Sequence, residues 1–229
     1  MFQKAIIDGA SNKHNDKLEL LQGLIQKYPA SALVADADLE IANTYLANED
    51  YDNAVPYLNN IIKNKNAEAL YPQAYLKTGV AYFNVKKNEE ALTNFKTLVT
   101  KYSNSQESDE AVEYIRNIFI ANQQPGEFVS FMKQNGKDVS YNEEDSLTYR
   151  SALMRYENKE FNNALQGFAQ YLSKFPDGHY SVEANYFSAE VNIADKNSNA
   201  ALPFYNIVAS KAPNKYAERS ALQLSLIHI

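Results

Sequence analysis

The sequence predicts an all-α protein built from repeated pairs of antiparallel helices. Three observations support this prediction: end-of-unit residues recur at a fixed spacing, small residues hold matching places inside amphipathic stretches, and helix-breaking residues are few. The 229 residues include only 7 Gly and 7 Pro, and no stretch shows the alternating pattern typical of strands. In such a repeat array each helix pair buries its open face on the next pair, so the core is continuous along the chain.

The unit at 72–108 shows the pattern most clearly, as two amphipathic helices joined by a turn. Gly79 lies three residues before Tyr82 in the first helix, and Ala91 lies four residues before Phe95 in the second. Both spacings place the two residues on one helical face. A residue with little side chain lets two helices cross closely, and its large neighbours fill the surrounding space.

The same frame extends over the whole chain with a period of about 37 residues. Successive end-of-unit positions are 37, 37, 37, 36 and 37 residues apart, and they are Pro29, Asn66, Ser103, Ser140, Pro176 and Pro213. The frame predicts units at 1–34, 35–71, 72–108, 109–144, 145–181, 182–218 and 219–229, of which 109–144 is degenerate and the last is truncated. Because the frame is broken at both ends, we expect a fragment of a longer array, with 225–229 foreign to the repeat.

Taken in order, the apolar pattern predicts individual helices and their boundaries. The expected helices include 17–25, 35–47, 51–62, 110–120, 128–132 and 219–224. Turns are expected at 12–15 and 124–126, and a loop is expected at 134–140. Pro56 and Pro203 occupy equivalent places, which we assign to the first turn of their helices, where no N–H is needed. Ser146 or Asn142 is the expected cap of the helix that carries Tyr149.

The order of key residues in these units resembles the tetratricopeptide repeat (TPR). The pattern is a small residue, a Tyr, an Ala, a large apolar residue and an end-of-unit residue. Three units show all five, namely Gly79, Tyr82, Ala91, Phe95 and Ser103; Ala42, Tyr45, Ala54, Leu58 and Asn66; and Ala152, Tyr156, Ala164, Phe168 and Pro176. A fourth unit shows the pattern without the Tyr, as Ala189, Ala201, Tyr205 and Pro213. Tyr156 is one place late, and Asn192 stands where a Tyr is usual. The resemblance implies a right-handed superhelical solenoid.

A narrower resemblance lies in the turns that join the units. The segments 27–31, 101–105 and 174–178 all begin with Lys and an aromatic residue. This variant is similar to bacterial cell-envelope TPR proteins, such as the Tol-Pal-associated coordinators and the BamD-like lipoproteins. It implies a location in the periplasm or cell envelope.

Composition and charge exclude several functions. The net charge of −6 disfavours nucleic-acid binding, because an acidic surface repels phosphate groups. The sequence has no Cys, which excludes disulfides, thiolate metal sites and a Cys nucleophile. No run of about 18 apolar residues is present, so we expect no membrane span. The first residues lack the basic start and apolar stretch of a signal peptide.

The sequence contains no convincing catalytic or metal motif. His14, His179 and His228 lie in two turns and the C-terminal tail, without metal-ligand spacing. No Gly-rich phosphate loop is present, so we expect neither a cofactor nor an enzyme. The acidic run 143–145 suits the start of a helix, and it could form half of an acid–base pair only with a partner that the sequence does not reveal.

The remaining candidate is a binding surface. In TPR proteins the first helices of the repeats line a concave face, and the corresponding residues here are mostly apolar or aromatic. They are Leu39, Asn43, Leu46, Leu76, Val80, Phe83, Tyr149, Leu153, Tyr156, Tyr186, Glu190 and Ile193. The resemblance implies a groove for a protein or peptide partner. The alternative is that many of these side chains only pack between repeats. No lysine accompanies Asn43, unlike in the carboxylate-clamp TPRs.

The preferred interpretation is therefore a non-catalytic interaction scaffold. A first alternative is a structural spacer, or a self-assembly segment whose open ends bind further copies. A second alternative is a positioning segment of a larger protein that contains an enzyme.

Overall fold

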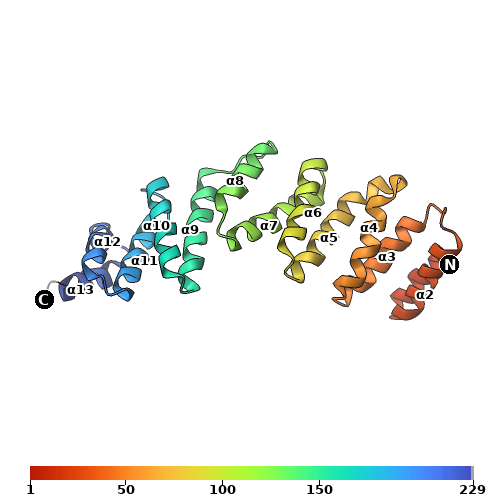
Figure 1. Ribbon diagram of the computed structural model, residues 1–229, viewed down its shortest axis with the longest axis horizontal. Coiled ribbons are helices and arrows are strands. Elements are labelled where there is room, and N and C mark those ends of the chain that lie inside the picture. The colour runs from red at the N-terminus through yellow and green to blue at the C-terminus, as the bar shows by residue number, and fades with distance from the viewer. Residues whose placement is uncertain (228–229) are drawn as a thin grey trace. The chain divides into compact units, whose positions relative to one another are not determined.

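The computed structural model describes residues 1–227, and all regular structure in that range is helical, as predicted (Figure 1). The helices are α1 (Phe2–Ala10), α2 (His14–Lys27), α3 (Val34–Ala47), α4 (Tyr51–Lys63), α5 (Tyr71–Asn84), α6 (Asn88–Lys101), α7 (Gln106–Ala121), α8 (Pro125–Gln134), α9 (Tyr141–Glu157), α10 (Phe161–Lys174), α11 (Ser181–Ala194), α12 (Ser198–Ser210) and α13 (Ala217–Ile227), with a 3-10 segment η1 (Lys65–Leu70) after α4. His228 and Ile229 lie outside the described residues.

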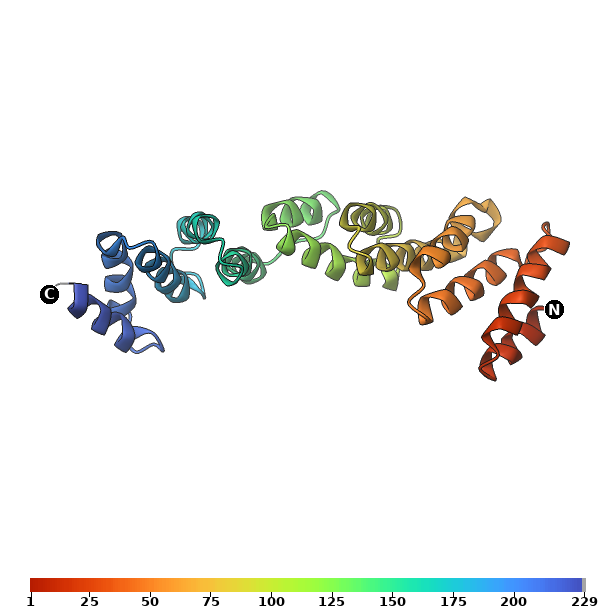
Figure 2. The same cartoon turned by 60° about the horizontal axis from the view of Figure 1, so that its bottom comes forward.

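The chain forms two compact units, Met1–Ile118 and Phe119–Ile229, and their boundary falls inside α7. In unit 1, α1 packs on α2, α3 on α4 and α5 on α6, and each pair also contacts the next through α2–α3 and α4–α5. In unit 2, α9 packs on α10 and α11 on α12, and α10–α11 and α12–α13 join successive pairs. Figure 2 shows these neighbouring helices side by side within each unit.

The turn between the two helices of each pair repeats with the predicted period. A non-glycine residue with positive φ lies two positions before each second helix, and these residues are Asn12, Glu49, Lys86, Gln123, Lys159 and Lys196. Their spacing is 37, 37, 37, 36 and 37 residues, the same as that of the end-of-unit positions. The period is therefore a property of the backbone as well as of the sequence.

A Schellman motif closes the first helix at each of these turns. At Lys86, its own N–H bonds to the carbonyl of Phe83 (3.1 Å), and the N–H of Lys87 bonds to the carbonyl of Tyr82 (2.9 Å). The equivalent long bond from Gln124 to Phe119 measures 2.8 Å, in the unit with no clean sequence match. The degenerate unit therefore keeps the backbone geometry of the others.

The structure corrects the expected boundaries of that unit. Pro125 does not lie in a turn but in the first turn of α8, which is longer than the predicted 128–132. The expected loop at 134–140 begins one residue later, because Gln134 is the last residue of α8. The cap of α9 is Ser140, whose hydroxyl accepts a 3.2 Å hydrogen bond from the N–H of Glu143. Neither Ser146 nor Asn142 is the cap, because α9 begins earlier than the apolar pattern suggested. His14 likewise begins α2 rather than lying in a turn.

Pro56 and Pro203 are equivalent, as predicted, but they do not lie in the first turn. Pro56 lies five residues after Tyr51, the first residue of α4, and Pro203 lies five residues after Ser198, the first residue of α12. At that depth an ordinary residue would donate to the carbonyl four positions earlier, and proline cannot. The first-turn explanation is therefore wrong for both residues.

The small residues of the frame lie at the helix crossings. All of them are buried, and none of the alanines exceeds 1% exposure: Ala5, Ala42, Ala54, Ala91, Ala152, Ala164, Ala189 and Ala201. Gly79 lies against the ring of Phe95, and a Cβ at Gly79 would be 2.7 Å from Cδ1 of that ring. In unit 2, Gly167 of α10 lies close to Ala152 of α9, and an added Cβ would lie 2.9 Å from the Cβ of Ala152. The sequence frame did not single out Gly167.

Candidate functional site

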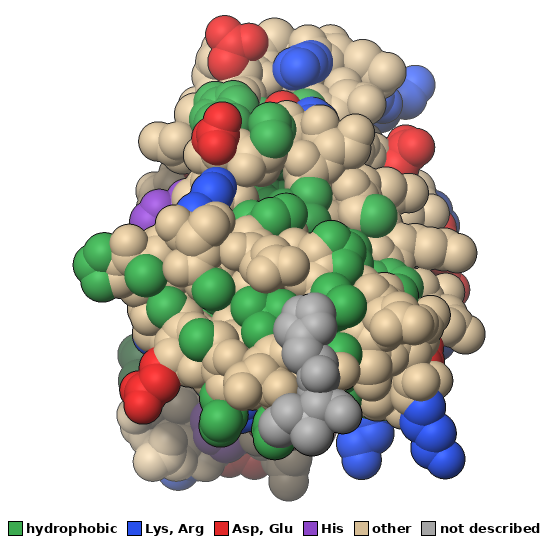
Figure 3. Space-filling view, turned by 90° about the vertical axis from the view of Figure 1, so that its left-hand side faces the viewer, with side chains coloured by type: hydrophobic (Ala, Val, Ile, Leu, Met, Phe, Trp, Pro, Cys, Tyr) green, Lys and Arg blue, Asp and Glu red, His purple; other side chains and the backbone are tan. Residues whose placement is uncertain are grey.

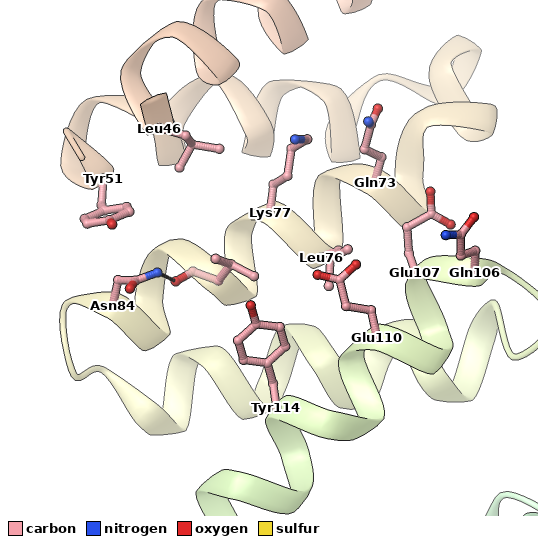
Figure 4. Close-up of a pocket in the computed structure, with 11 residues that line it drawn as sticks. Leu46, Tyr51, Gln73, Leu76, Lys77, Asn84, Gln106, Glu107, Glu110 and Tyr114 are labelled. Atoms are coloured by element: carbon pink, nitrogen blue, oxygen red, sulfur yellow. Dashed lines mark hydrogen bonds between the residues drawn. The ribbon is translucent and has the colours of Figure 1, made fainter. Parts of the chain in front are cut away.

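The candidate site is a pocket in unit 1 with a volume of about 470 Å³ (Figure 4). First helices of consecutive pairs, α3, α5 and α7, supply most of its walls. Its lining residues are Leu46, Tyr51, Gln73, Leu76, Lys77, Val80, Asn84, Gln106, Glu107, Glu110 and Tyr114. We call it the α5–α7 pocket.

One stripe of α5 forms a wall of the pocket. Gln73, Lys77, Val80 and Asn84 are spaced by four, three and four residues, so they share one helical face. The Nδ2 group of Asn84 donates a 2.9 Å hydrogen bond to the carbonyl of Val80, which the dashed line in Figure 4 marks. This bond holds the Asn84 amide against its own helix, at the rim of the pocket.

A matching stripe of α7 forms the facing wall. Glu107, Glu110 and Tyr114 follow each other by three and four residues, and Figure 4 shows their side chains extending from α7. Lys77 extends from α5. Within residues 1–227, neither Lys77 nor the two carboxylates has an ion-pair partner or a side-chain hydrogen bond. The pocket therefore holds three unpaired charges, one positive and two negative.

Packing beneath the pocket holds Tyr114 in place. Its ring stacks on Phe95 with centroids 4.9 Å apart and meets the edge of Phe83 at 5.3 Å. Burial and, next, the negative charge of Glu110 raise the pKa of the Tyr114 hydroxyl. The hydroxyl therefore remains protonated and keeps its hydrogen-bond donor.

Three of the predicted groove residues meet in this pocket. Leu46, Leu76 and Val80 supply its apolar surface. Phe83 lies beside it under Tyr114, Leu39 packs on the core between α3 and α4, and Asn43 is half-buried on α3. Within unit 1, some of the predicted groove residues thus line the pocket, and others pack against neighbouring helices.

The predicted groove residues of unit 2 are largely engaged with the array itself. Tyr149 is 5% exposed and stacks on Tyr180 at 4.4 Å, and Tyr186 is 4% exposed and stacks on Tyr216 at 4.2 Å. Leu153 and Ile193 pack on the two hydrophobic clusters of this unit, and Tyr156 lies 4.8 Å from Phe187.

Glu190 is also engaged. It accepts a 2.6 Å hydrogen bond from the hydroxyl of Tyr205 and pairs with Arg219 at 3.0 Å. Little of the predicted surface of unit 2 is therefore left free for a partner.

The repeat frame does not identify the polar residues of the α5–α7 pocket. The groove positions of the frame contain no lysine, whereas Lys77 lies one residue beyond Leu76. The signal was present as the polar stripe 73–77–84 on α5 and the stripe 107–110–114 on α7. What the sequence could not indicate is that these two stripes face each other.

Among residues 1–227, no group of three or more His, Cys, Asp or Glu side chains is placed to hold a metal ion. Asp145, the buried member of the acidic run, is hydrogen-bonded to Tyr171 and to the backbone of His179. In the same range no helix is long and apolar enough to cross a membrane.

Comparison with known proteins agrees with this architecture. Residues 73–105 and 145–178 each match the family model of the tetratricopeptide repeat. These two segments resemble tetratricopeptide repeats, a kind of repeat that generally binds proteins or peptides. No curated protein matches the sequence.

Solved structures with similar folds include two bacterial repeat proteins. A tetratricopeptide repeat protein from Parabacteroides merdae superposes with a TM-score of 0.51 at 14% identity, over 100% of this chain and 97% of that chain. The C-terminal part of a TPR repeat-containing protein from Cytophaga hutchinsonii gives a TM-score of 0.47 at 16% identity, over 99% of this chain and 92% of that one. The first likeness supports the fold alone.

Proposed function

We propose that the chain is a non-catalytic interaction scaffold in which the α5–α7 pocket binds a segment of another protein. The observation that carries this proposal is the pocket itself, formed by first helices of consecutive pairs and holding unpaired polar groups. First helices form the face that the family uses for its partners.

The chemistry of the lining suits a polypeptide segment. Leu46, Leu76 and Val80 offer apolar contact, while the amides of Gln73 and Gln106 offer both donors and acceptors. A peptide backbone presents the same two kinds of group at every residue. A volume of about 470 Å³ lies within the range of small-ligand pockets, so it suits a few side chains of a bound segment rather than a whole domain.

A display experiment tests the proposal. We would select peptides from a random phage library on the purified chain and measure their affinities by fluorescence anisotropy. Val80→Arg fills the pocket and should weaken binding at least about tenfold, whereas Ala169→Arg, at an exposed position of α10, should change it by less than about twofold. Circular dichroism would check folding, and Tyr51→Ala is a milder second pocket variant. Equal affinities for all variants would contradict the proposal.

Self-assembly is the second candidate, and one observation favours it. Leu222 and Leu226 on α13 are 60% and 57% exposed and lie four residues apart, hence on one helical face. Figure 3 looks onto the C-terminal side of the chain, where hydrophobic side chains lie among polar ones. Sedimentation at increasing concentration would reveal self-association, and Leu222→Glu should abolish it. A concentration-independent mass would exclude this candidate.

The location in the cell envelope also remains a proposal. It rests on the turns that begin with Lys and an aromatic residue at 27–31, 101–105 and 174–178. Fractionation of the source cells with an antibody against the chain would test it, and recovery in the cytosol alone would contradict it.

A further inference from the structure

We infer that the α5–α7 pocket selects protein segments that carry a lysine or arginine side chain, which Glu107 and Glu110 bind. This inference rests on the proposed function, because it specifies the segment that the pocket takes. It depends on charges, burial and packing within unit 1.

The first step is the pair of carboxylates. Glu107 and Glu110 are three residues apart on α7, so they lie on the same face, and both line the pocket. Two like charges in this arrangement repel each other. A cation placed between them removes that repulsion and gains two charge-assisted hydrogen bonds.

The second step is that Glu107 differs from the other half-buried glutamates. Glu40 pairs with Lys17 at 2.6 Å, Glu144 with Lys174 at 2.5 Å, and Glu190 with Arg219 at 3.0 Å. Among residues 1–227, Glu107 is the half-buried glutamate with neither an ion pair nor a side-chain hydrogen bond. The array supplies a partner for each of the others, so the missing partner of Glu107 points to a ligand.

The third step is the apolar surface that lies beside these charges. Leu76 is 8% exposed at the pocket, and the half-buried ring of Tyr114 lies next to Glu110. The long alkyl stem of Lys or Arg would at the same time contact Leu46 and Val80.

The fourth step is the role of Lys77 on the opposite wall. One positive charge against two negative charges leaves the pocket negative, so an acidic segment is repelled overall. Lys77 can donate to a backbone carbonyl or to a carboxylate of the same segment. A segment with a basic side chain and an adjacent hydrogen-bond acceptor would thus satisfy both walls.

The test uses the full chain and the peptide selection described above. The selected peptides should be enriched in Lys and Arg, and replacing that residue by Gln should weaken binding about tenfold. The Glu107→Gln, Glu110→Gln double variant should lose about as much affinity and should no longer distinguish the two peptides. Binding should also weaken as the salt concentration rises.

The matched control is the Glu89→Gln, Glu90→Gln double variant. These glutamates lie in the first turn of α6, as Glu107 does in α7, and they do not line the pocket. The control should keep wild-type affinity within about twofold. The contrary result is a set of peptides that bind the wild type, fail to bind Val80→Arg and keep their affinity for the Glu107→Gln, Glu110→Gln double variant. That result would overturn this inference while leaving the proposed function intact. Selection of no peptide at all would overturn both.

Discussion

The carboxylate of Asp145 on α9 accepts a 2.5 Å hydrogen bond from the hydroxyl of Tyr171 on α10. Both residues are buried, at 1% and 0% exposure. The other carboxylate oxygen accepts from the N–H of His179 (2.7 Å), and the Tyr171 hydroxyl accepts from the N–H of Tyr180 (3.0 Å). Gly178 makes room for this network, because a Cβ there would lie 2.8 Å from Oδ1 of Asp145. The buried acid thus joins two helices to the turn before α11.

We predict that breaking this bond destabilises unit 2. Tyr171→Phe removes the donor, and Asp145→Asn removes the charge; each should lower the free energy of unfolding by about 1.5–3 kcal/mol, the usual range for a hydrogen bond to a charged group. In a double-mutant cycle measured by urea unfolding, the coupling energy should exceed about 1 kcal/mol. Tyr141→Phe, at a residue that is 60% exposed, is the control. Strictly additive effects would mean that the two groups do not interact.

A second prediction concerns the helix crossings. Ala91→Leu and Ala164→Leu should each cost about 1–3 kcal/mol, because both alanines are fully buried and an inserted side chain overpacks the crossing. Gly79→Ala should also destabilise, even though Ala is the better helix former, since its Cβ would press on the Phe95 ring. Thermal unfolding would measure all three, with Ala169→Leu on the exposed side of α10 as the control. Neutral results at Ala91 and Ala164 would show that these sites are not tight crossings.

A third prediction follows from Asp38 in α3. Burial raises the pKa of its carboxyl group to about 6, although a 3.4 Å hydrogen bond from Asn60 opposes the rise. In the unfolded chain the pKa is near 3.8, so the folded state holds the proton more tightly. The contribution of Asp38 to stability is therefore most favourable below about pH 4 and is lost as the pH rises to about 6 and above.

Asp38→Asn should accordingly stabilise the protein by about 1–3 kcal/mol at pH 7, and the gain should vanish near pH 4. Denaturant unfolding of both proteins at several pH values would measure the difference. Asp36→Asn makes the same change of charge on the same helix at a half-buried residue, and it serves as the control. A gain that does not depend on pH would refute the assignment to Asp38.

A fourth prediction uses the repeated left-handed turn. Lys159 has φ of 63°, which glycine adopts without strain but a residue with a Cβ does not. Lys159→Gly should therefore raise the free energy of unfolding by about 0.5–1 kcal/mol, whereas Lys159→Ala should not. Chemical unfolding of the two variants distinguishes conformational strain from loss of the charge. Equal stabilities would argue against strain at this turn.

Much of the fold was predictable because it depends on local pattern. The spacing of Ala42, Gly79 and Ala152 identified the buried helix faces, and the end-of-unit spacing identified the period that the turns at Lys86 and Lys159 repeat. Helix starts were less predictable: Ser140 rather than Ser146 caps α9. The apolar pattern marks only the face that packs, and a first turn exposed to solvent is polar on all sides.

The candidate site was only half predictable. Leu46, Leu76 and Val80 follow from the repeat frame, and the structure brings them together in one pocket. Lys77, Glu107 and Glu110 do not follow from it, because a charged residue on a helix usually indicates a solvated face.

The sequence by itself determined the helices, their pairing, the period and the small residues at the crossings, since these depend on contacts between residues close in the chain. The tertiary structure alone decided which polar side chains share a pocket and which acids have partners. Asp145 and Glu107 illustrate this, because each is an acidic residue near the start of a first helix, α9 and α7 respectively. Tyr171 satisfies Asp145, and no side chain in residues 1–227 satisfies Glu107. That difference depends on which side chains meet when the helices pack, which a local pattern does not encode.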